Sequence, residues 1–281
     1  MDRLGTIAAV VITYNAESKI RDCLDSLLNQ TVPPFEIIVV DCGSTDNTLE
    51  ILDRYGVVKH VTQKKGFAVQ RNIGANLSSS SYLIFIDADM ILPKKLFEEC
   101  LYYLSHSYDS LVVPERFVGT GFWGHVRSFE RTFYDSVTWI EGARWFRRDV
   151  FFEIGGYDES LPLGEEWSLD ESVRSQYRVG RAKHTILCAE GELRLRDLLR
   201  KKAYYVEHSS GFDAFRKKHP ERASKVLSPL LRASLFLQHP LTLARHPLLS
   251  LGLLLLGGGE LAVNYSPFLR TRLASDPWKK K

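Results

Sequence analysis

Hydrophobic and polar positions follow two alternating patterns through the first half of the chain. Four runs rich in apolar and β-branched residues predict buried strands, at residues 6–13, 35–41, 57–62 and 82–87. Between them, apolar residues recur at helical spacing in residues 19–29, 45–55 and 67–77. Strands that alternate with helices predict an α/β fold with a mostly parallel sheet covered on both faces.

The pattern changes in the second half of the chain. Residues 112–180 mix aromatic and polar positions, with an acidic patch at 163–171. Residues 193–205 are basic and aromatic, and residues 226–263 are rich in leucine but interrupted by prolines. The apolar run at 247–259 is shorter than a comfortable bilayer span and is followed by a glutamate. These features predict a C-terminal region of short helices.

Composition narrows the class of protein. With 281 residues, 44% hydrophobic and 25% charged, the chain can bury a substantial core as one domain or as a domain with an appendage. A net charge of +3 is too small to indicate a nucleic-acid partner. The cysteines lack disulfide or zinc spacing, which favours a reducing compartment. The short N-terminal apolar run is expected to be a strand, not a signal peptide, so we expect a cytoplasmic protein.

Several polar side chains follow the predicted strands at their carboxyl ends, where ligands bind in parallel sheets. They are Tyr14 after the first strand, Asp41 after the second, and Asp87 and Asp89 after the last. Two aspartates separated by one residue can share a divalent cation with the phosphates of a nucleotide diphosphate. A solvated Asp-x-Asp turn is the simpler alternative for the triplet.

Four motifs occur in order: TYNAE at 13–17, DCGSTDNT at 41–48, KGFAVQRNIGA at 65–75 and YLIFIDAD at 82–89. Four ordered motifs over about 80 residues are far more specific than any one of them. This set resembles glycosyltransferase family 2, whose catalytic domains have the GT-A fold, over roughly residues 7–180. The resemblance implies an inverting transferase with a UDP- or GDP-sugar donor.

The resemblance also implies roles for residues around the nucleotide. Thr13, Tyr14 and Glu17 would line its pocket, with the tyrosine ring against the base. Asp41 would accept a hydrogen bond from the base. Many relatives have a second aspartate where this chain has Cys42. Packing of Tyr14 and helix capping by Asp41 are the structural alternatives.

A second set of residues is expected to contact the donor phosphates and the metal ion. By resemblance, Arg71 would approach the phosphates, Asp87 would contact the ribose or the metal, and Asp89 would hold Mn²⁺ or Mg²⁺ directly. Arg71 could equally be a surface arginine. Asp46 also lies in these motifs, but we interpret it as a helix cap.

A second acidic cluster, GEEWSL at 164–169, follows GGYDESLP at 155–162. The pair resembles the segment of the family that presents the catalytic base to the acceptor. Its usual aspartate corresponds to Glu166 and a later aspartate to Ser168, with Glu165 as the second candidate for the base. Inversion needs a carboxylate that deprotonates the attacking hydroxyl. An acidic first helical turn favoured by the helix dipole is the alternative.

A third metal ligand is not evident in the sequence. Relatives often have a histidine at the position that corresponds here to Cys188. His184 and His208 lie nearby, but single histidines are more often structural, so neither is assigned as a ligand.

The C-terminal region combines cations, tyrosines and leucine-rich helices. Such a region predicts monotopic attachment to the cytoplasmic face of a membrane. A polyprenyl-phosphate or glycan acceptor would fit this placement. A helical subdomain packed on the core, or an oligomer contact, is the alternative.

We therefore expect a GT-A domain over residues 1–192, with a nucleotide-sugar half at about 1–110 and an acceptor half at about 111–192, followed by a membrane-associating region at 193–281. Two other functions stay open. A catalytically silent nucleotide-sugar-binding scaffold is compatible with the Cys42 and Ser168 departures. A sugar nucleotidyltransferase is disfavoured because TYNAESK lacks a glycine-rich loop.

Overall fold

The chain forms two compact units in the computed structural model, which describes residues 5–207 and 209–273. The first unit comprises residues 1–115 and 136–189, and the second comprises residues 116–135 and 190–281. Residues 116–135 belong with the C-terminal helices, although the sequence placed the boundary after residue 192.

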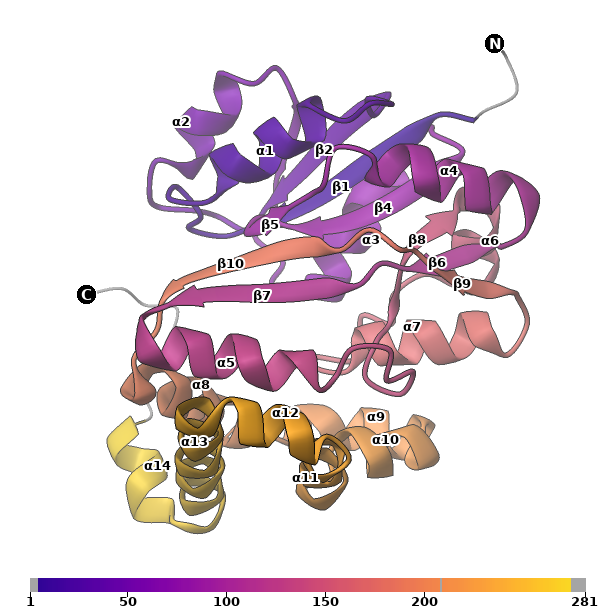
Figure 1. The fold of residues 1–281 in the computed structure, drawn as a ribbon. Coiled ribbons are helices and arrows are strands. Elements are labelled where there is room, and N and C mark those ends of the chain that lie inside the picture. The colour runs from indigo at the N-terminus through magenta and orange to yellow at the C-terminus, as the bar shows by residue number, and fades with distance from the viewer. Residues whose placement is uncertain (1–4, 208, 274–281) are drawn as a thin grey trace. The chain divides into compact units, whose positions relative to one another are not determined.

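The first unit is built on a seven-stranded sheet with the order β3-β2-β1-β4-β8-β6-β9 (Figure 1). Its strands are β1 (Ile7–Thr13), β2 (Glu36–Asp41), β3 (Val58–Val61), β4 (Tyr82–Asp87), β6 (Ser110–Val112), β8 (Ala143–Arg147) and β9 (Val179–Arg181). Strands β3, β2, β1 and β4 are mutually parallel, whereas β8 is antiparallel to both β4 and β6. The predicted α/β fold is confirmed.

Helices flank this sheet (Figure 1), and the apolar spacing predicted the three that lie between the first four strands in sequence. They are α1 (Ile20–Leu28), α2 (Thr48–Asp53), α3 (Phe67–Leu77), α4 (Leu96–His106), α6 (Arg148–Glu153) and α7 (Glu165–Arg174). Helix α3 packs on β1 and β2 at Gly74, where an added Cβ would lie 2.3 Å from Val10 Cγ1. Glycine at this position therefore sets how closely α3, which carries Arg71, approaches the sheet.

A short strand pair completes the first unit. Strand β5 (Met90–Ile91) pairs antiparallel with the start of β10 (Ile186–Glu192), where Cys188 lies opposite Met90. All four cysteines are free thiols. This pairing fixes the segment after β4 beside β10.

Helix α2 begins three residues later than its apolar pattern predicted. The Thr45 N–H donates to Asn15 Oδ1 at 2.8 Å, which holds Thr45 in the preceding loop. Asp46 Oδ1 accepts from the Thr48 N–H at 3.0 Å. Asp46 thus bonds the first residue of α2 from the preceding loop, but the N-cap is Asn47 and makes no side-chain capping bond, so the interpretation of Asp46 as the helix cap is wrong.

The second unit is mostly helical. It contains all of β7 (Glu115–Thr120) except its first residue, together with α5 (Gly121–Thr132), α8 (Leu195–Glu207), a 3₁₀ turn (Ser209–Phe212), α9 (Asp213–Lys218), α10 (Pro220–Val226), α11 (Pro229–Leu237), α12 (Pro240–Arg245), α13 (Pro247–Tyr265) and α14 (Pro267–Leu273). Prolines begin α10 to α14, which is the favoured place for proline in a helix. Helix α5 packs on α13, where a Cβ at Gly252 would lie 2.4 Å from Val126 Cγ2.

Helix α13 is longer than the apolar run that predicted it. It continues past Glu260 to Tyr265 and spans 19 residues. The carboxylate of Glu260 lies 3.8 Å from Lys202 Nζ, so the charge is paired within the unit. By length and composition, α13 is the one helix of the described chain that could cross a membrane, and 22% of its most apolar stretch is buried.

Candidate active site

The parallel strands bring the predicted nucleotide residues to one edge of the sheet. In the strand register, Thr13 lies opposite Asp41 on β2, and Ile12 lies opposite Asp87 on β4. Asp41 and Asp87 therefore flank the end of β1 on either side. The prediction that one edge collects these side chains is confirmed.

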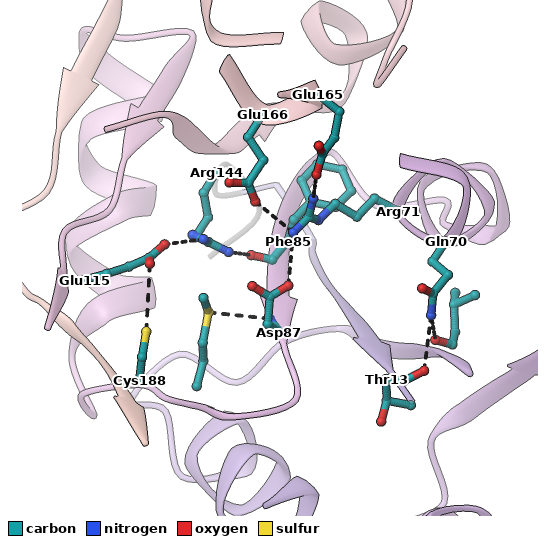
Figure 2. Close-up of polar contacts among 12 residues, drawn as sticks. Thr13, Gln70, Arg71, Phe85, Asp87, Glu115, Arg144, Glu165, Glu166 and Cys188 are labelled. Atoms are coloured by element: carbon teal, nitrogen blue, oxygen red, sulfur yellow. Dashed lines mark hydrogen bonds and ion pairs between the residues drawn. The ribbon is translucent and has the colours of Figure 1, made fainter. Parts of the chain in front are cut away.

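Helix α3 sends two adjacent polar side chains to this edge, but in different directions (Figure 2). Gln70 Nε2 donates to the carbonyl oxygens of Thr13 at 3.2 Å and Val40 at 3.0 Å, and so joins the ends of β1 and β2. Arg71 points toward Asp87. Gln70 therefore holds the ends of β1 and β2 together, and Arg71 places a positive charge beside Asp87.

Arg71 joins three carboxylates from different parts of the first unit (Figure 2). Its Nη2 lies 3.0 Å from Asp87 Oδ1 and 2.7 Å from Glu166 Oε1, and its Nη1 lies 3.0 Å from Glu165 Oε1. Burial would lower the pKa of this guanidinium, but the surrounding carboxylates raise it well above its usual value. Arg71 is a buried connecting cation, so the surface alternative is wrong.

Both members of the Asp87–Asp89 pair face cations. Burial would raise the pKa of Asp87, but Arg71 and Arg144 outweigh it and hold the pKa below its usual value. Asp89 Oδ2 lies 3.3 Å from Lys19 Nζ, and both side chains are partly exposed. Asp87 is therefore held as a carboxylate by two arginines, and its side chain, 33% exposed, is about as accessible as that of Asp89, 37% exposed.

Glu165 and Glu166 occupy the first turn of α7, directly after Gly164 with its left-handed φ of 88°. Their environments differ. The Glu165 side chain is 9% exposed and that of Glu166 is 42% exposed. Burial and the charge of Glu166 raise the pKa of Glu165 to about 7 although Arg71 opposes this. Glu166 is thus the more accessible of the two carboxylates.

Two residues that the sequence analysis missed, the buried Arg144 and the partly exposed Glu115, lie near Asp87 (Figure 2). Arg144 on β8 donates from Nη1 to the Phe85 carbonyl at 2.7 Å and forms a close ion pair with Glu115. Burial raises the pKa of Glu115 against the opposing charge of Arg144. An arginine between apolar residues in the strand ARWFR was the available signal, because an unpaired cation is costly to bury.

Lys19, also missed, follows TYNAE and carries no distinguishing pattern in the sequence.

The loops after β1 and β2 are joined to each other. Glu17 Oε2 accepts from the Asn47 N–H at 3.1 Å, and Asn15, at a positive φ of 48°, donates its N–H to Ser44 Oγ at 2.8 Å. Asp41 is completely buried, and Ser44 donates to both of its carboxylate oxygens. Asp41 and Glu17 therefore shape these loops, and their direct contacts with a nucleotide stay predictions.

Tyr14 and Thr13 differ from these loop residues. The Tyr14 ring is half exposed, as a platform for a base would be. The Thr13 hydroxyl is buried and has no hydrogen-bond partner in the described part of the chain. A bound nucleotide would supply the partner that this hydroxyl lacks.

The fit of a divalent cation can be judged from these carboxylates. Among the described residues, no group of three or more His, Cys, Asp and Glu side chains could hold a metal ion. Mg²⁺ and similar cations, however, often bind through one or two carboxylates together with substrate phosphates. Asp89, paired with a partly exposed lysine, and Asp87 fit that arrangement.

The residues considered as a third ligand do not complete a metal cage. Burial and the charge of Glu115 raise the pKa of Cys188, so its thiol stays protonated. His184 Nδ1 lies 2.5 Å from Glu99 Oε2 and is held in that pair. His208 lies outside the described residues.

Known proteins resemble the chain both in sequence and in fold. It is 38% identical over 92 residues to a poly(ribitol-phosphate) beta-glucosyltransferase of Bacillus spizizenii, a match that covers 30% of this chain but 14% of that protein. It is 26% identical over 194 residues to a PGL/p-HBAD biosynthesis glycosyltransferase of Mycobacterium bovis, covering 65% and 75% of the two chains. The chain thus spans a minor part of the first of these relatives.

Solved structures share the fold. S. aureus TarS in complex with UDP-GlcNAc superimposes with a TM-score of 0.56 at 20% identity, over 78% of this chain and 72% of that one. The mannosyltransferase PcManGT from Pyrobaculum calidifontis, in complex with GDP-Man and Mn²⁺, has a TM-score of 0.58 at 19% identity, over 96% and 83%. These similarities confirm the GT-A fold.

Residues 8–157 match the family described as Glycosyl transferase family 2. That segment contains the strand ends, Arg71, Asp87 and Asp89. The chain therefore belongs to glycosyl transferase family 2.

Proposed function

We propose that this protein is an inverting glycosyltransferase that moves a sugar from a UDP- or GDP-sugar to an acceptor hydroxyl. One observation carries the proposal: Arg71 links Asp87, at the expected donor site, to Glu166 on α7. Donor-side and acceptor-side groups thus share one buried cation. Relatives in complex with UDP-GlcNAc and with GDP-Man support the donor class.

The residues divide the chemistry between them. Glu166, half exposed at the start of α7, would accept the proton of the attacking hydroxyl as the sugar's anomeric carbon inverts. Arg71 would stabilise the negative charge that develops on the leaving diphosphate. Thr13 and Tyr14 would hold the nucleoside, with the Tyr14 ring against the base.

Asp89 and Asp87 would hold Mn²⁺ or Mg²⁺ together with the donor diphosphate. When bound, the cation would neutralise charge on the leaving group. The Mn²⁺ in the PcManGT complex supports this choice. In the structure Lys19 lies at Asp89, and its partly exposed ammonium can move away when a cation takes its place.

Asp89→Asn should strongly weaken metal-dependent nucleotide binding while leaving the fold intact. The amide keeps the shape of the side chain but loses the charge that holds the cation, so affinity in Mn²⁺ should fall on the order of 100-fold. Thermal shift with UDP and GDP, with and without Mn²⁺, measures this. Asp53→Asn is the matched control because Asp53 is an exposed carboxylate on α2. Unchanged affinity in Asp89→Asn would remove the metal from the proposal.

We also propose that the second unit attaches the enzyme to the cytoplasmic face of a membrane, where the acceptor would be lipid-linked or part of a surface glycan. Exposed leucines gather on its last helices, notably Leu230, Leu241, Leu248 and Leu254. Burying such apolar surface in the headgroup boundary is favourable.

Liposome co-sedimentation tests the attachment. The full chain should bind vesicles that contain anionic lipid, and high salt should weaken this binding without abolishing it, because the apolar contact is not screened. Carbonate extraction then separates charge-held attachment from insertion: a protein held at the surface mainly by charge is released, whereas one with α13 inserted in the membrane is retained. Protein that stays in the supernatant at low salt would contradict membrane attachment.

A further inference from the structure

Three consecutive backbone N–H groups of the loop after β1 each donate to a side chain of the segment after β2. The pairs are Asn15 with Ser44 Oγ at 2.8 Å, Ala16 with Thr48 Oγ1 at 2.8 Å, and Glu17 with Asp46 Oδ2 at 3.1 Å. The partners are 29 to 32 residues apart in the sequence. The path of the loop after β1 is therefore determined by side chains of a different segment.

Tyr14 lies between two residues that are both bonded to the segment after β2. On one side, the Thr13 carbonyl accepts from the Cys42 N–H at 3.0 Å. On the other side, Asn15 has a φ of 48°, a left-handed conformation that persists in a non-glycine residue only where its surroundings require it. Asn15 Oδ1 also accepts from the Thr45 N–H at 2.8 Å. The backbone of Tyr14 is therefore fixed at both ends, beneath a ring that is half exposed.

Asp46 and Thr48 are bonded to each other as well as to this loop. Thr48 is completely buried, and its hydroxyl accepts from the Ala16 N–H while it donates to Asp46 Oδ1 at 2.5 Å. Burial would raise the pKa of Asp46, but hydrogen bonds from Thr48 and from the Glu17 N–H outweigh it and lower the pKa. The loop after β1 is thus held in part by an ionised carboxylate, and such hydrogen bonds are stronger than those between neutral groups.

We propose that Asp46 and Thr48 are positioning residues for donor binding, which hold the loop after β1 so that the Tyr14 ring is in place before the nucleotide arrives. A loop that is already ordered loses less conformational entropy on binding, and this raises affinity. The inference rests on the proposed function in one respect, the contact between Tyr14 and the base. Thr48 is buried and both oxygens of Asp46 bond the protein, so these residues act through the loop.

Thr48→Val should weaken the binding of UDP or GDP in Mn²⁺ about tenfold, measured by calorimetry with the full chain. Valine keeps the branched shape but leaves the Ala16 N–H without its acceptor, a loss that corresponds to about this factor. The KM for the donor should rise about as much, while turnover at saturating donor stays within about twofold, because the groups around the sugar are unchanged. Thr48→Ser keeps the hydroxyl and should recover most of the affinity.

Asp46→Asn should weaken nucleotide binding by a similar factor. The amide has one oxygen where the carboxylate has two, so its NH₂ group faces either the Glu17 N–H or the Thr48 N–H. Thr31→Val is the matched control, because it removes a hydroxyl hydrogen bond to Glu98 from the segment before β2, at the opposite end of the strand. It should leave nucleotide affinity unchanged. An equal loss in Thr31→Val would show a general effect of destabilisation and overturn the proposal.

A double-mutant cycle with Tyr14→Ala separates positioning from a purely structural role. If Thr48 acts through the placement of Tyr14, Thr48→Val should weaken nucleotide binding much less in the Tyr14→Ala background than in the wild type. If the two losses are fully additive, Thr48 does not act through Tyr14 and the proposal is wrong.

Hydrogen exchange of residues 15–17 reports on the loop without any nucleotide. The Ala16 amide should exchange at least about tenfold faster in Thr48→Val than in the wild type, since its acceptor is gone. Unchanged exchange would overturn the proposal. Normal nucleotide binding in both Thr48→Val and Asp46→Asn would overturn the positioning role and leave the proposed function intact. A wild type that binds neither UDP nor GDP would contradict both.

Discussion

Glu166→Gln is expected to lower turnover by about 10²–10⁴-fold, the usual contribution of a positioned general base. Donor affinity should change little, because the amide still fits beside Arg71 and the lost basicity matters when the acceptor hydroxyl is deprotonated. Steady-state turnover with a nucleotide-sugar, together with donor binding by calorimetry, separates these effects.

Glu165→Gln is the control for position, since the two side chains are neighbours on α7 and contact the same arginine. With a pKa raised to about 7, Glu165 is protonated to a large extent at neutral pH, and glutamine resembles that form. Its effect on turnover should be much smaller. Loss of turnover in Glu165→Gln alone would transfer the role of base to Glu165. Full turnover in both variants would indicate an acceptor phosphate, which needs no base.

Arg71→Leu is expected to reduce both stability and activity. It leaves the buried Glu165 and the partly exposed Asp87 without their shared cation, and removing one partner of a buried ion pair costs about 3–5 kcal/mol. For a unit of this size the melting temperature should fall on the order of 10 °C. Thermal unfolding followed by circular dichroism measures the change, and donor binding in the surviving folded fraction measures the loss at the site.

Arg71→Lys tests whether charge or geometry is responsible. An ammonium keeps the charge but cannot bond Glu165, Glu166 and Asp87 from one planar group. Stability should recover in part, while turnover should stay low because Glu166 and Asp87 are no longer held together. Wild-type stability in Arg71→Leu would contradict the view that Arg71 neutralises a buried acidic cluster.

Much of the first unit could be predicted because its signals are local. Three apolar runs became β1, β2 and β4 at nearly the expected residues, since buried parallel strands have to be apolar throughout. Strand β3, at the edge of the sheet, also formed where it was expected although most of it is exposed. Parallel strands also place their carboxyl ends at one edge, so Asp41 and Asp87 could be placed near each other in advance. The start of α2 could not, because Asn15, far away in sequence, holds Thr45 outside the helix.

The sequence predicted which residues form the site but not which of them form ion pairs with one another. Arg71, Asp87, Glu165 and Glu166 were all named from motifs, yet nothing in those motifs indicates that one guanidinium bonds three carboxylates. Arg144 and Glu115 were missed because each stands alone in its own segment. Lys19 was missed because an exposed lysine has no pattern of its own.

The sequence by itself determined the family, the parallel sheet and the residue types available at its edge, because apolar periodicity and motif order are properties of the chain alone. The tertiary structure decided which charges meet. In the folded chain Ser44 donates hydrogen bonds to both carboxylate oxygens of Asp41, and Glu166 is more exposed than Glu165. The tertiary structure also joined residues 116–135 to the C-terminal helices. Burial and ion pairing depend on distances between segments far apart in sequence, and only the folded chain sets those distances.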